Sequence, residues 1–541
     1  MGRVSEAQAA EHPAAQHSFF VHYVVVGLVG SILVAIGSLG VGWLPVNTSL
    51  YGNPVVSALR SPDAGVALAR FCVIAGMALV LQAWLVLGYD VLRGRVRSLP
   101  ALWWTLFAWS APLLLTPPLF SRDAFAYFTQ GKLLIQGLNP YDVGVAAESG
   151  WFNDGADPLW AESPTPYGPL FLLLERGVAE FVGPHPVWAA IAFRLWAMLA
   201  VAVLAVCVPI LARRHGISDA KALWLAVLNP LVLMHFVAGA HNDALMTASV
   251  VAGLLLAVDY KPVLGTIVLA IGISVKPIAL VALPFIGLIW AGVNAGWGAR
   301  IRAWLASGAI TVVVVVGLGM ISGTGLGWIA ALSTPGTIRT WLSPPTALGL
   351  VTGGAVRAVG FGDHVDLAVQ VFRGLATLAA VGILLYLVLR PRGRSGVRGA
   401  GLALLTVVVL GPVVQPWYLL WSLPVIVAAG MASRWLHATI LITAVLTLHG
   451  VAGTSATSDA LFEFSDGLGL LLVALVLAVI VWASPRERVL LLGDSDDPGL
   501  VPDDRPAQAR FDQMQPGEQH RVQLVDLLVQ MRDLELGLQV D

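Results

Sequence analysis

The sequence predicts an all-α polytopic membrane protein with about 14 membrane-spanning helices. Three observations support this prediction. The 541-residue chain is 57% hydrophobic and only 12% charged, whereas soluble domains are about 45–50% apolar and about 25% charged. Its apolar residues come in blocks of about twenty, the length that crosses a bilayer as a helix. Lys and Arg (31) balance Asp and Glu (32), so the chain offers no basic surface for nucleic acid.

Each apolar block is assigned to one helix, because a lipid-facing backbone must satisfy its hydrogen bonds within its own segment. The first block has no small-residue cleavage site, so we expect a membrane anchor and not a cleaved signal. The two cysteines, Cys72 and Cys207, lie inside such blocks and are read as buried thiols. The expected spans are 20–43, 66–88, 100–119, 187–212, 220–238, 242–258, 262–276, 277–292, 302–321, 366–389, 399–414, 417–432, 435–452 and 465–484.

The orientation follows from the basic loops, which lie on one side of the membrane if the amino terminus is cytoplasmic and the spans alternate. Loops rich in Lys and Arg stay in the cytoplasm. We therefore expect a multi-pass plasma-membrane protein with cytoplasmic residues 1–19, a membrane domain over 20–484 and both termini cytoplasmic. The residues that set this orientation are Arg93, Arg95, Arg97, Arg213, Arg214, Lys261, Arg300, Arg302, Arg390, Arg392, Arg394, Arg398, Arg486 and Arg488.

The regions outside the spans divide into two long extracytoplasmic loops, over 120–186 and 322–365, and a cytoplasmic tail, 485–541. Loops of this length are uncommon without a function. Residues 170–182 are apolar but too short to span, which predicts an interfacial helix in the large first loop. The tail is polar and acidic, as expected for a disordered linker. Apolar residues at helical spacing over 522–534 predict one short amphipathic helix in it.

The start of the first outer loop carries the strongest candidate for chemistry, Asp123. Pro117 and Pro118 end the preceding span, and Ser121 can cap the helix that follows. One interpretation is that Asp123 complements the amino terminus of that helix. The other is a general base at the lip of an apolar bundle, with Arg122 beside it to adjust its pKa.

Aromatic and amide side chains follow in the same loop. Asn139, Tyr141, Trp160 and Tyr167 lie in Gly-Leu-Asn-Pro-Tyr, Trp-rich and Pro-Tyr-Gly-Pro stretches. Aromatic rings that cover a hexose, with polar groups for its hydroxyls, predict a sugar site. Interfacial anchoring explains the same residues equally well.

A polar turn interrupts the apolar blocks near the same outer face. His241, Asn242 and Asp243 lie in this turn. His241 and Asp243 are possible metal ligands, but two ligands do not make a site. Helix capping and a substrate contact remain the alternatives, since polar groups within a membrane are costly and often functional.

Cations and further aromatics occur at other outer turns. Lys276 precedes Pro277, where it either snorkels to the interface or pairs with a phosphate as a point charge. The second outer loop contains Arg339 and Trp341, and another turn contains the Gln415-Pro416-Trp417-Tyr418 sequence. Together these residues would suit a reaction between a lipid-linked phosphosugar and a second sugar.

Several motifs, in order from about residue 20 to 484, resemble the actinobacterial polyprenyl-phosphomannose-dependent α-1,6-mannosyltransferases of the MptA/MptB family. The acidic tail matches nothing in that family. His-Asn-Asp and Val-Lys-Pro together resemble MptB more than MptA. The motifs are Ser121-Arg122-Asp123 with Tyr127, Gln130 and Gly131, Gly137–Tyr141, Pro166–Pro169, Asn229–Leu231, His241-Asn242, Val275–Pro277 and Pro416–Tyr418.

The resemblance implies a GT-C glycosyltransferase bundle and an inverting transfer at the extracytoplasmic face. The implied donor is polyprenyl (decaprenyl) phosphate mannose, and the implied acceptor is the lipid-anchored α-1,6-mannan core of lipomannan and lipoarabinomannan. Asp123 would take the acceptor proton, while Lys276, Arg339 and Arg122 would bind the donor phosphate. We expect sugar and acceptor contacts from Tyr127, Asn139, Tyr141, Trp160, Tyr167, His241, Asn242, Asp243, Trp341, Gln415, Trp417 and Tyr418.

No cofactor or metal is called for by these residues, although metal dependence stays open, and the expected partners are the donor, the acceptor and membrane lipids. Two other functions are compatible with the pattern. A lipid or sugar transporter would also have many spans and Pro-broken helices, but we find no inverted repeat of hydropathy. A non-catalytic subunit of an envelope complex would use the tail as its binding element.

Overall fold

The computed structural model describes residues 13–452, 485–492 and 499–500, apart from the single positions 47, 62, 293, 333 and 392. The chain divides into unit 1, Met1–Leu500, and unit 2, Val501–Asp541. Every described element belongs to unit 1. The predicted span at 465–484 and the predicted amphipathic helix at 522–534 lie outside the described residues.

The regular secondary structure of the described residues is helical apart from two short strands, β1 (Met431–Ala432) and β2 (Gly499–Leu500), which pair antiparallel. The α-helices are α1 (Pro13–Val41), α2 (Pro54–Arg60), α3 (Asp63–Leu92), α4 (Leu99–Ser110), α5 (Asp123–Ile135), α6 (Pro169–Val182), α7 (Pro186–Arg214), α8 (Asp219–Ala226), α9 (Asp243–Val258), α10 (Pro262–Ile273), α11 (Leu283–Ala291), α12 (Trp297–Ser322), α13 (Trp328–Ala331), α14 (Pro344–Ala358), α15 (Val365–Leu389), α16 (Gly396–Leu410), α17 (Leu419–Ala428), α18 (Ser433–Ala452) and α20 (Pro485–Leu492). Short 3-10 helices are η1 (Ser49–Gly52), η2 (Ala111–Leu115), η3 (Val145–Ala147), η4 (Pro158–Trp160), η6 (Pro277–Ala282), η7 (Thr334–Thr337) and η8 (Pro416–Tyr418), whereas η5 (Val232–Ala238) is a π-helix.

Among the residues that the structure describes, five helices are long and apolar enough to cross a membrane, namely His22–Val41 of α1 and the whole of α3, α7, α12 and α15. A sixth span forms if η5 and α9, which meet at a bend of 112°, count as one broken segment. The all-α class and several membrane-length helices are therefore confirmed, but about 14 spans are not. The predicted span at 220–238 is instead α8 followed by η5, because Asn229-Pro230 interrupts it.

Glycine allows the first two long helices, α1 and α3, to pack closely. A side chain at Gly30 would lie 2.7 Å from the Gly76 carbonyl oxygen, and one at Gly76 would lie 2.5 Å from the Gly30 carbonyl oxygen. Small residues at such crossings let two membrane helices make backbone-to-backbone contact. Trp84 and Trp224 connect α3 to α8, since the indole N–H of each residue donates to the backbone carbonyl oxygen of the other.

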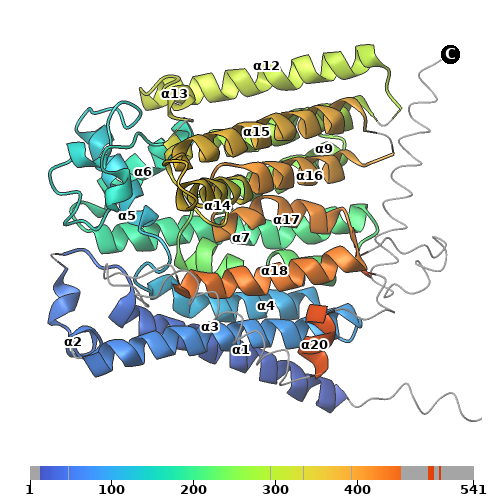
Figure 1. Cartoon of the computed structure of the whole chain (residues 1–541). Coiled ribbons are helices and arrows are strands. Elements are labelled where there is room, and N and C mark those ends of the chain that lie inside the picture. Colours follow the sequence, from blue (N-terminus) through green and yellow to red (C-terminus); the bar gives the residue numbers. More distant parts are fainter. Residues whose placement is uncertain are drawn as a thin grey trace, which may run out of the picture. The chain divides into compact units, whose positions relative to one another are not determined.

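The predicted first outer loop, 120–186, contains α5 and α6, which pack together at one end of the helices of unit 1, on the left of Figure 1. The predicted interfacial helix at 170–182 corresponds to α6. Its Glu175 is fully buried, and neither carboxylate oxygen has a hydrogen-bond partner among the described residues. Burial without a compensating charge raises the pKa of Glu175 well above its usual value.

The opposite end of these helices, on the right of Figure 1, carries α20. The guanidinium groups of Arg93 and Arg486 lie over the ring of Tyr89, at 4.6 and 5.7 Å from its centroid. His437 Nδ1 lies 2.7 Å from the carbonyl oxygen of Leu490. The start of the tail, where a linker was predicted, therefore packs as a helix on α3 and α18.

The predicted second outer loop, 322–365, is partly helical and packs against the segment that follows α16. Thr340, Ser343 and Thr346 donate from their hydroxyls to carbonyl oxygens of residues 411–414. Arg373 on α15 donates to the carbonyl oxygens of Gly336 and Ile338, each at 2.7 Å. These bonds hold residues 336–338 in the wall of the cavity described next.

Candidate functional site

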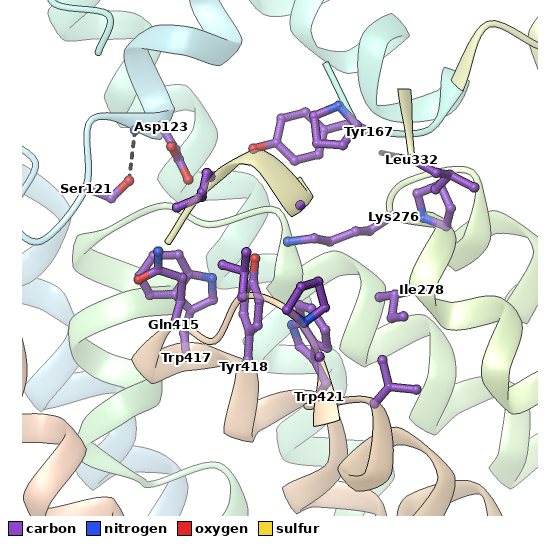
Figure 2. A pocket seen from close by; sticks show the side chains of 18 of the residues that line it. Ser121, Asp123, Tyr167, Lys276, Ile278, Leu332, Gln415, Trp417, Tyr418 and Trp421 are labelled. Carbon is purple, nitrogen blue, oxygen red and sulfur yellow. Dashed lines mark hydrogen bonds between the residues drawn. The ribbon is translucent and has the colours of Figure 1, made fainter. Parts of the chain in front are cut away.

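A cavity of about 860 Å³ lies where the two predicted outer loops meet the helices of unit 1. Its walls come from residues 120–123, 157–167, 276–281, 328–338 and 407–421. Asp123 and Gln415 lie on one side of the cavity, Ile278 and Leu332 lie on the other, and the amine of Lys276 points into the space between them (Figure 2). The cavity is thus polar on one side and apolar on the other.

Asp123 is placed by the sharp turn that joins η2 to α5. Phe120 has φ of 67°, a left-handed conformation that is unusual for a bulky residue and reverses the chain before α5. The Asp123 N–H donates to the Ser121 hydroxyl at 3.0 Å, as Figure 2 shows. Asp123 is the first residue of α5, and its side chain is 17% exposed. The carboxylate therefore lines the cavity while most of its side chain is shielded from water.

The Asp123 carboxylate has one firm donor and one close neighbour. Trp160 Nε1 donates to Oδ1 at 3.1 Å, and His241 Nε2 lies 3.7 Å from Oδ2. Burial raises the pKa of Asp123, and the hydrogen bond from Trp160 and the positive charge of Lys276 oppose this rise. A carboxyl group with a raised pKa is a stronger base once it is ionised, as general-base catalysis requires.

His241 lies in the tight break between η5 and α9. Its Nδ1 lies 2.8 Å from the carbonyl oxygen of His235, an acceptor, so Nδ1 carries the hydrogen of the neutral ring. The Nε2 lone pair then faces Asp123. Trp417 stacks on the His241 ring with centroids 3.9 Å apart and holds its plane.

Lys276 and Asp243 form a buried ion pair in the same region. The Lys276 amine lies 2.7 Å from Asp243 Oδ1, which also accepts the Trp421 indole N–H at 2.5 Å. The Lys276 side chain is 14% exposed and lies 5.2 and 5.1 Å from the ring centroids of Tyr418 and Trp421. The Tyr167 ring centroid lies 5.9 Å away, so a single cation is oriented by one carboxylate and three rings, with its remaining donors available to the cavity.

The structure brings together most of the predicted site residues. Arg122 lines the cavity, and its Nε donates to the carbonyl oxygen of Gly155 at 2.7 Å. His241 and Asp243 contact lining residues from behind. The predicted residues that line the cavity are Asp123, Arg122, Trp160, Tyr167, Lys276, Gln415, Trp417 and Tyr418.

Other predicted residues lie outside the cavity lining. Arg339 is 46% exposed and pairs with Asp366 at 2.7 Å, and Trp341 is 57% exposed. Asn139 accepts the N–H of Tyr141 within its own turn. These three side chains therefore have local partners or face outward.

Three more predicted residues are buried behind the cavity wall. Tyr141 is buried and donates to the carbonyl oxygen of Tyr167 at 2.8 Å. Tyr127 packs edge-on against Tyr167, and Asn242 is buried next to Asp243. Their contacts support the residues that face the space.

Trp421 is a lining residue that the sequence analysis missed. The signal was available, because Trp421 follows Trp417 by one helical turn, and residues four apart share a face of a helix. For a metal, no group of three or more His, Cys, Asp or Glu residues converges within the part of the chain that the structure describes.

Two family models match the chain. The N-terminal domain of alpha-(1->6)-mannopyranosyltransferases matches residues 24–292, and the MptB C-terminal domain matches residues 345–482. The first match covers α5, His241, Asp243 and Lys276, and the second covers Gln415, Trp417 and Tyr418. No solved structure matches the chain.

Curated relatives extend over most of the chain. A probable alpha-(1->6)-mannopyranosyltransferase of Mycolicibacterium smegmatis is 34% identical, with 89% of this chain and 91% of that protein covered. An alpha-(1->6)-mannopyranosyltransferase of Mycobacterium tuberculosis is 33% identical, over 87% of this chain and 90% of that protein. Alpha-(1->6)-mannopyranosyltransferase B of Corynebacterium glutamicum is 30% identical, over 74% and 71%. The chain belongs to the MptA/MptB family of alpha-(1->6)-mannopyranosyltransferases.

Proposed function

We propose that this protein transfers mannose from polyprenyl (decaprenyl) phosphate mannose to a lipid-anchored α-1,6-mannan, in the synthesis of the lipomannan and lipoarabinomannan core. One observation carries the proposal. A carboxylate with a raised pKa, Asp123, and an oriented cation, Lys276, line a single cavity of about 860 Å³ with one apolar side. A sugar phosphate on a lipid has the matching combination of polar and apolar surface.

The reaction is an inverting displacement at C1 of the donor mannose. The acceptor 6-hydroxyl attacks C1 as Asp123 takes its proton, so that the new C1–O6 bond forms on the face opposite the phosphate. The C1–O bond to the phosphate breaks, and the polyprenyl phosphate leaves with the electron pair. A positioned base contributes about 10²- to 10⁴-fold to such a step, because a primary hydroxyl is a weak nucleophile.

Lys276 is the group that stabilises the departing phosphate. Charge builds on the phosphate oxygens as the bond breaks, and a preorganised cation in a site that excludes water stabilises that charge strongly. Arg122 also lines the cavity and is the second candidate. Arg339, the third predicted phosphate ligand, points to Asp366 and is not assigned this role.

The apolar side of the cavity suits the first isoprene units of the donor. Ile278, Leu280 and Val281 on η6 follow Lys276 directly along the chain and line the cavity. A phosphate held by Lys276 would therefore lead into an apolar wall, which supports a lipid-linked donor over a nucleotide sugar.

The active site is proposed to face the exterior of the plasma membrane, with both termini in the cytoplasm. Arg93 and Arg486 gather around Tyr89 at the end of unit 1 that carries α20, opposite α5. Positively charged loops tend to stay cytoplasmic, which supports an outer position for α5 and Asp123. The transporter alternative is not favoured, since the curated relatives are mannosyltransferases.

The test uses membranes that contain the full-length protein, polyprenyl-phosphate mannose and a short α-1,6-mannoside. Asp123→Asn is expected to remove nearly all turnover at unchanged expression. Asp142→Asn is the matched control, because Asp142 lies in the same loop, outside the cavity lining, and its carboxylate accepts a hydrogen bond from the side chain of Asn139. Turnover by Asp123→Asn at the level of Asp142→Asn would contradict the proposed role of Asp123.

A further inference from the structure

Arg194 is a buried charge on α7 that no step of the proposed reaction uses. Its side chain is 1% exposed. Nε and Nη2 donate to the carbonyl oxygen of Ala238 at 3.1 and 2.9 Å, and Nη1 donates to that of Leu114 at 3.4 Å. No carboxylate within the described residues forms an ion pair with it.

A guanidinium in such a position is costly unless its donors are used, so its contacts need an explanation. Both carbonyl groups lie where a helix ends and its oxygens lack a partner from a further turn. Ala238 is the last residue of η5, and Leu114 lies in the last turn of η2. The planar guanidinium group of Arg194 therefore connects the last turns of η5 and η2.

The segment after Ala238 is strained and leads directly to His241 and Asp243. Ala240 has φ of 55°, the left-handed region. A side chain at Gly239 would lie 2.6 Å from the His235 carbonyl oxygen and 2.8 Å from the His241 ring. A backbone of this kind persists only where the surrounding structure holds it in place. The two hydrogen bonds from Arg194 to the carbonyl oxygen of Ala238 are such a restraint.

The segment after Leu114 is also strained, and it leads to Asp123. Phe120, three residues before Asp123, also has a left-handed φ, 67°. Its ring lies against that of His235, with centroids 5.6 Å apart. Phe120 therefore packs against η5, the helix that leads into the other strained segment, and Arg194 donates to the residue that precedes each segment.

We propose that Arg194 is a positioning residue. It fixes the positions of the segments 114–123 and 238–243 relative to each other, so that His241 faces Asp123 and Asp243 faces Lys276. The proposal rests on the proposed function for its effect on turnover. Arg194 contacts no reacting atom. A displacement of about 1 Å in such a frame can lower the rate of an enzyme by about 10²-fold.

The experiment compares Arg194→Met and Arg194→Lys with wild type in the full-length protein. Met has a similar length without a charge, and Lys keeps the charge but cannot bridge both carbonyls. Trp109→Phe is the control, because it removes a comparable bond between helices, from the Trp109 indole to the Val24 carbonyl oxygen, away from the cavity. The readouts are kcat and donor KM per folded enzyme, and amide hydrogen exchange of the purified protein.

Arg194→Met is expected to lower kcat about 10- to 100-fold, with a smaller change in donor KM, and Arg194→Lys is expected to lie between Met and wild type. Exchange is expected to accelerate over 239–243 and 116–123, while Trp109→Phe leaves both segments unchanged. Wild-type kcat and wild-type exchange in Arg194→Met would overturn the proposal. If the Met variant does not fold, the same result in Arg194→Lys would overturn it.

Two results separate this proposal from the proposed function. If wild type transfers no mannose, the proposed function is wrong, and local exchange alone then decides whether Arg194 positions the two segments. A loss of folded protein with unchanged kcat per folded molecule and unchanged local exchange would mean that Arg194 only stabilises the bundle.

Discussion

His241 Nε2 lies 3.7 Å from Asp123 Oδ2, although the two residues come from separate turns, one before α9 and one at the start of α5. Because His241 Nδ1 is bonded to the His235 carbonyl oxygen, the facing Nε2 is unprotonated in the neutral ring. This lone pair can accept a hydrogen bond from Asp123 after Asp123 has taken the acceptor proton. The pairing therefore favours a carboxyl group that gains a proton during the reaction.

The pH dependence of turnover is expected to report Asp123. The base must be ionised, so kcat/KM should fall as the pH drops through the Asp123 pKa. Burial raises that pKa, so the fall should begin above the usual range of aspartate, which is near about 4. The measurement is a pH series of kcat/KM with purified enzyme.

Trp160→Phe is expected to move this acidic limb to higher pH. The indole N–H bonds to the charged carboxylate and opposes the rise in the Asp123 pKa, so its removal raises the pKa further. Trp328→Phe is the control, since Trp328 lines the same cavity but its indole nitrogen has no partner among the described residues. A limb that stays in place or moves to lower pH would count against Asp123 as the titrating base.

Lys276→Ala is expected to raise the donor KM about tenfold or more, since a hydrogen bond to a charged group contributes about 1.5–3 kcal/mol. Arg339→Ala should leave the donor KM within about twofold, because Arg339 is exposed and paired with Asp366, and exposed pairs contribute about 0–1 kcal/mol. Steady-state kinetics with varied donor concentration checks both. Equal effects of the two substitutions would exclude a special role for Lys276.

The loss in Lys276→Ala has a second possible cause, the Asp243 carboxylate that remains buried without its partner. The double variant Lys276→Ala with Asp243→Asn removes that charge. It should restore thermal stability but not donor affinity. Recovery of both would show that Lys276 serves only to neutralise Asp243.

Trp421→Phe is expected to lower kcat/KM about tenfold, because Asp243 loses its indole donor and Lys276 is then held less firmly. The stacking of residue 421 on Tyr418, with ring centroids 3.9 Å apart, is kept by Phe. Trp328→Phe is again the matched control. If both variants behaved alike, the effect would come from the loss of indole volume and not from the bond to Asp243.

Glu175→Gln is expected to keep or increase stability at neutral pH. The pKa of Glu175 is raised in the folded protein, so its ionisation costs stability as the pH rises above the unfolded-state value, and Gln avoids this cost. The thermal midpoints of variant and wild type should converge at pH 4 or below and diverge in favour of the variant as the pH increases. A variant that is less stable at neutral pH would indicate a charged Glu175 with a partner.

Several features followed directly from the order of residues. Blocks of apolar residues predicted a helical membrane protein, and Pro117-Pro118 followed by Ser121 and Asp123 predicted a helix with Asp123 in its first turn, as in α5. The cap position is Arg122 and not the predicted Ser121. These features are local, because capping, proline geometry and the cost of an unpaired backbone in lipid act within a few residues. The count of spans was less accurate, since proline and the π-helix η5 interrupt blocks that look continuous in composition.

The sequence by itself determined the helical class, the helix at the start of the first loop and the family, because each depends on residues that are neighbours in the chain or on a pattern spread over all of it. Only the tertiary structure decided the partners of the charged groups. Lys276 forms an ion pair with Asp243, Arg339 forms one with Asp366, and Arg194 donates hydrogen bonds to two carbonyl groups. In a low-dielectric interior a charge is stabilised by whichever opposite charge or dipole lies within a few ångströms, and the folding of distant segments sets that distance.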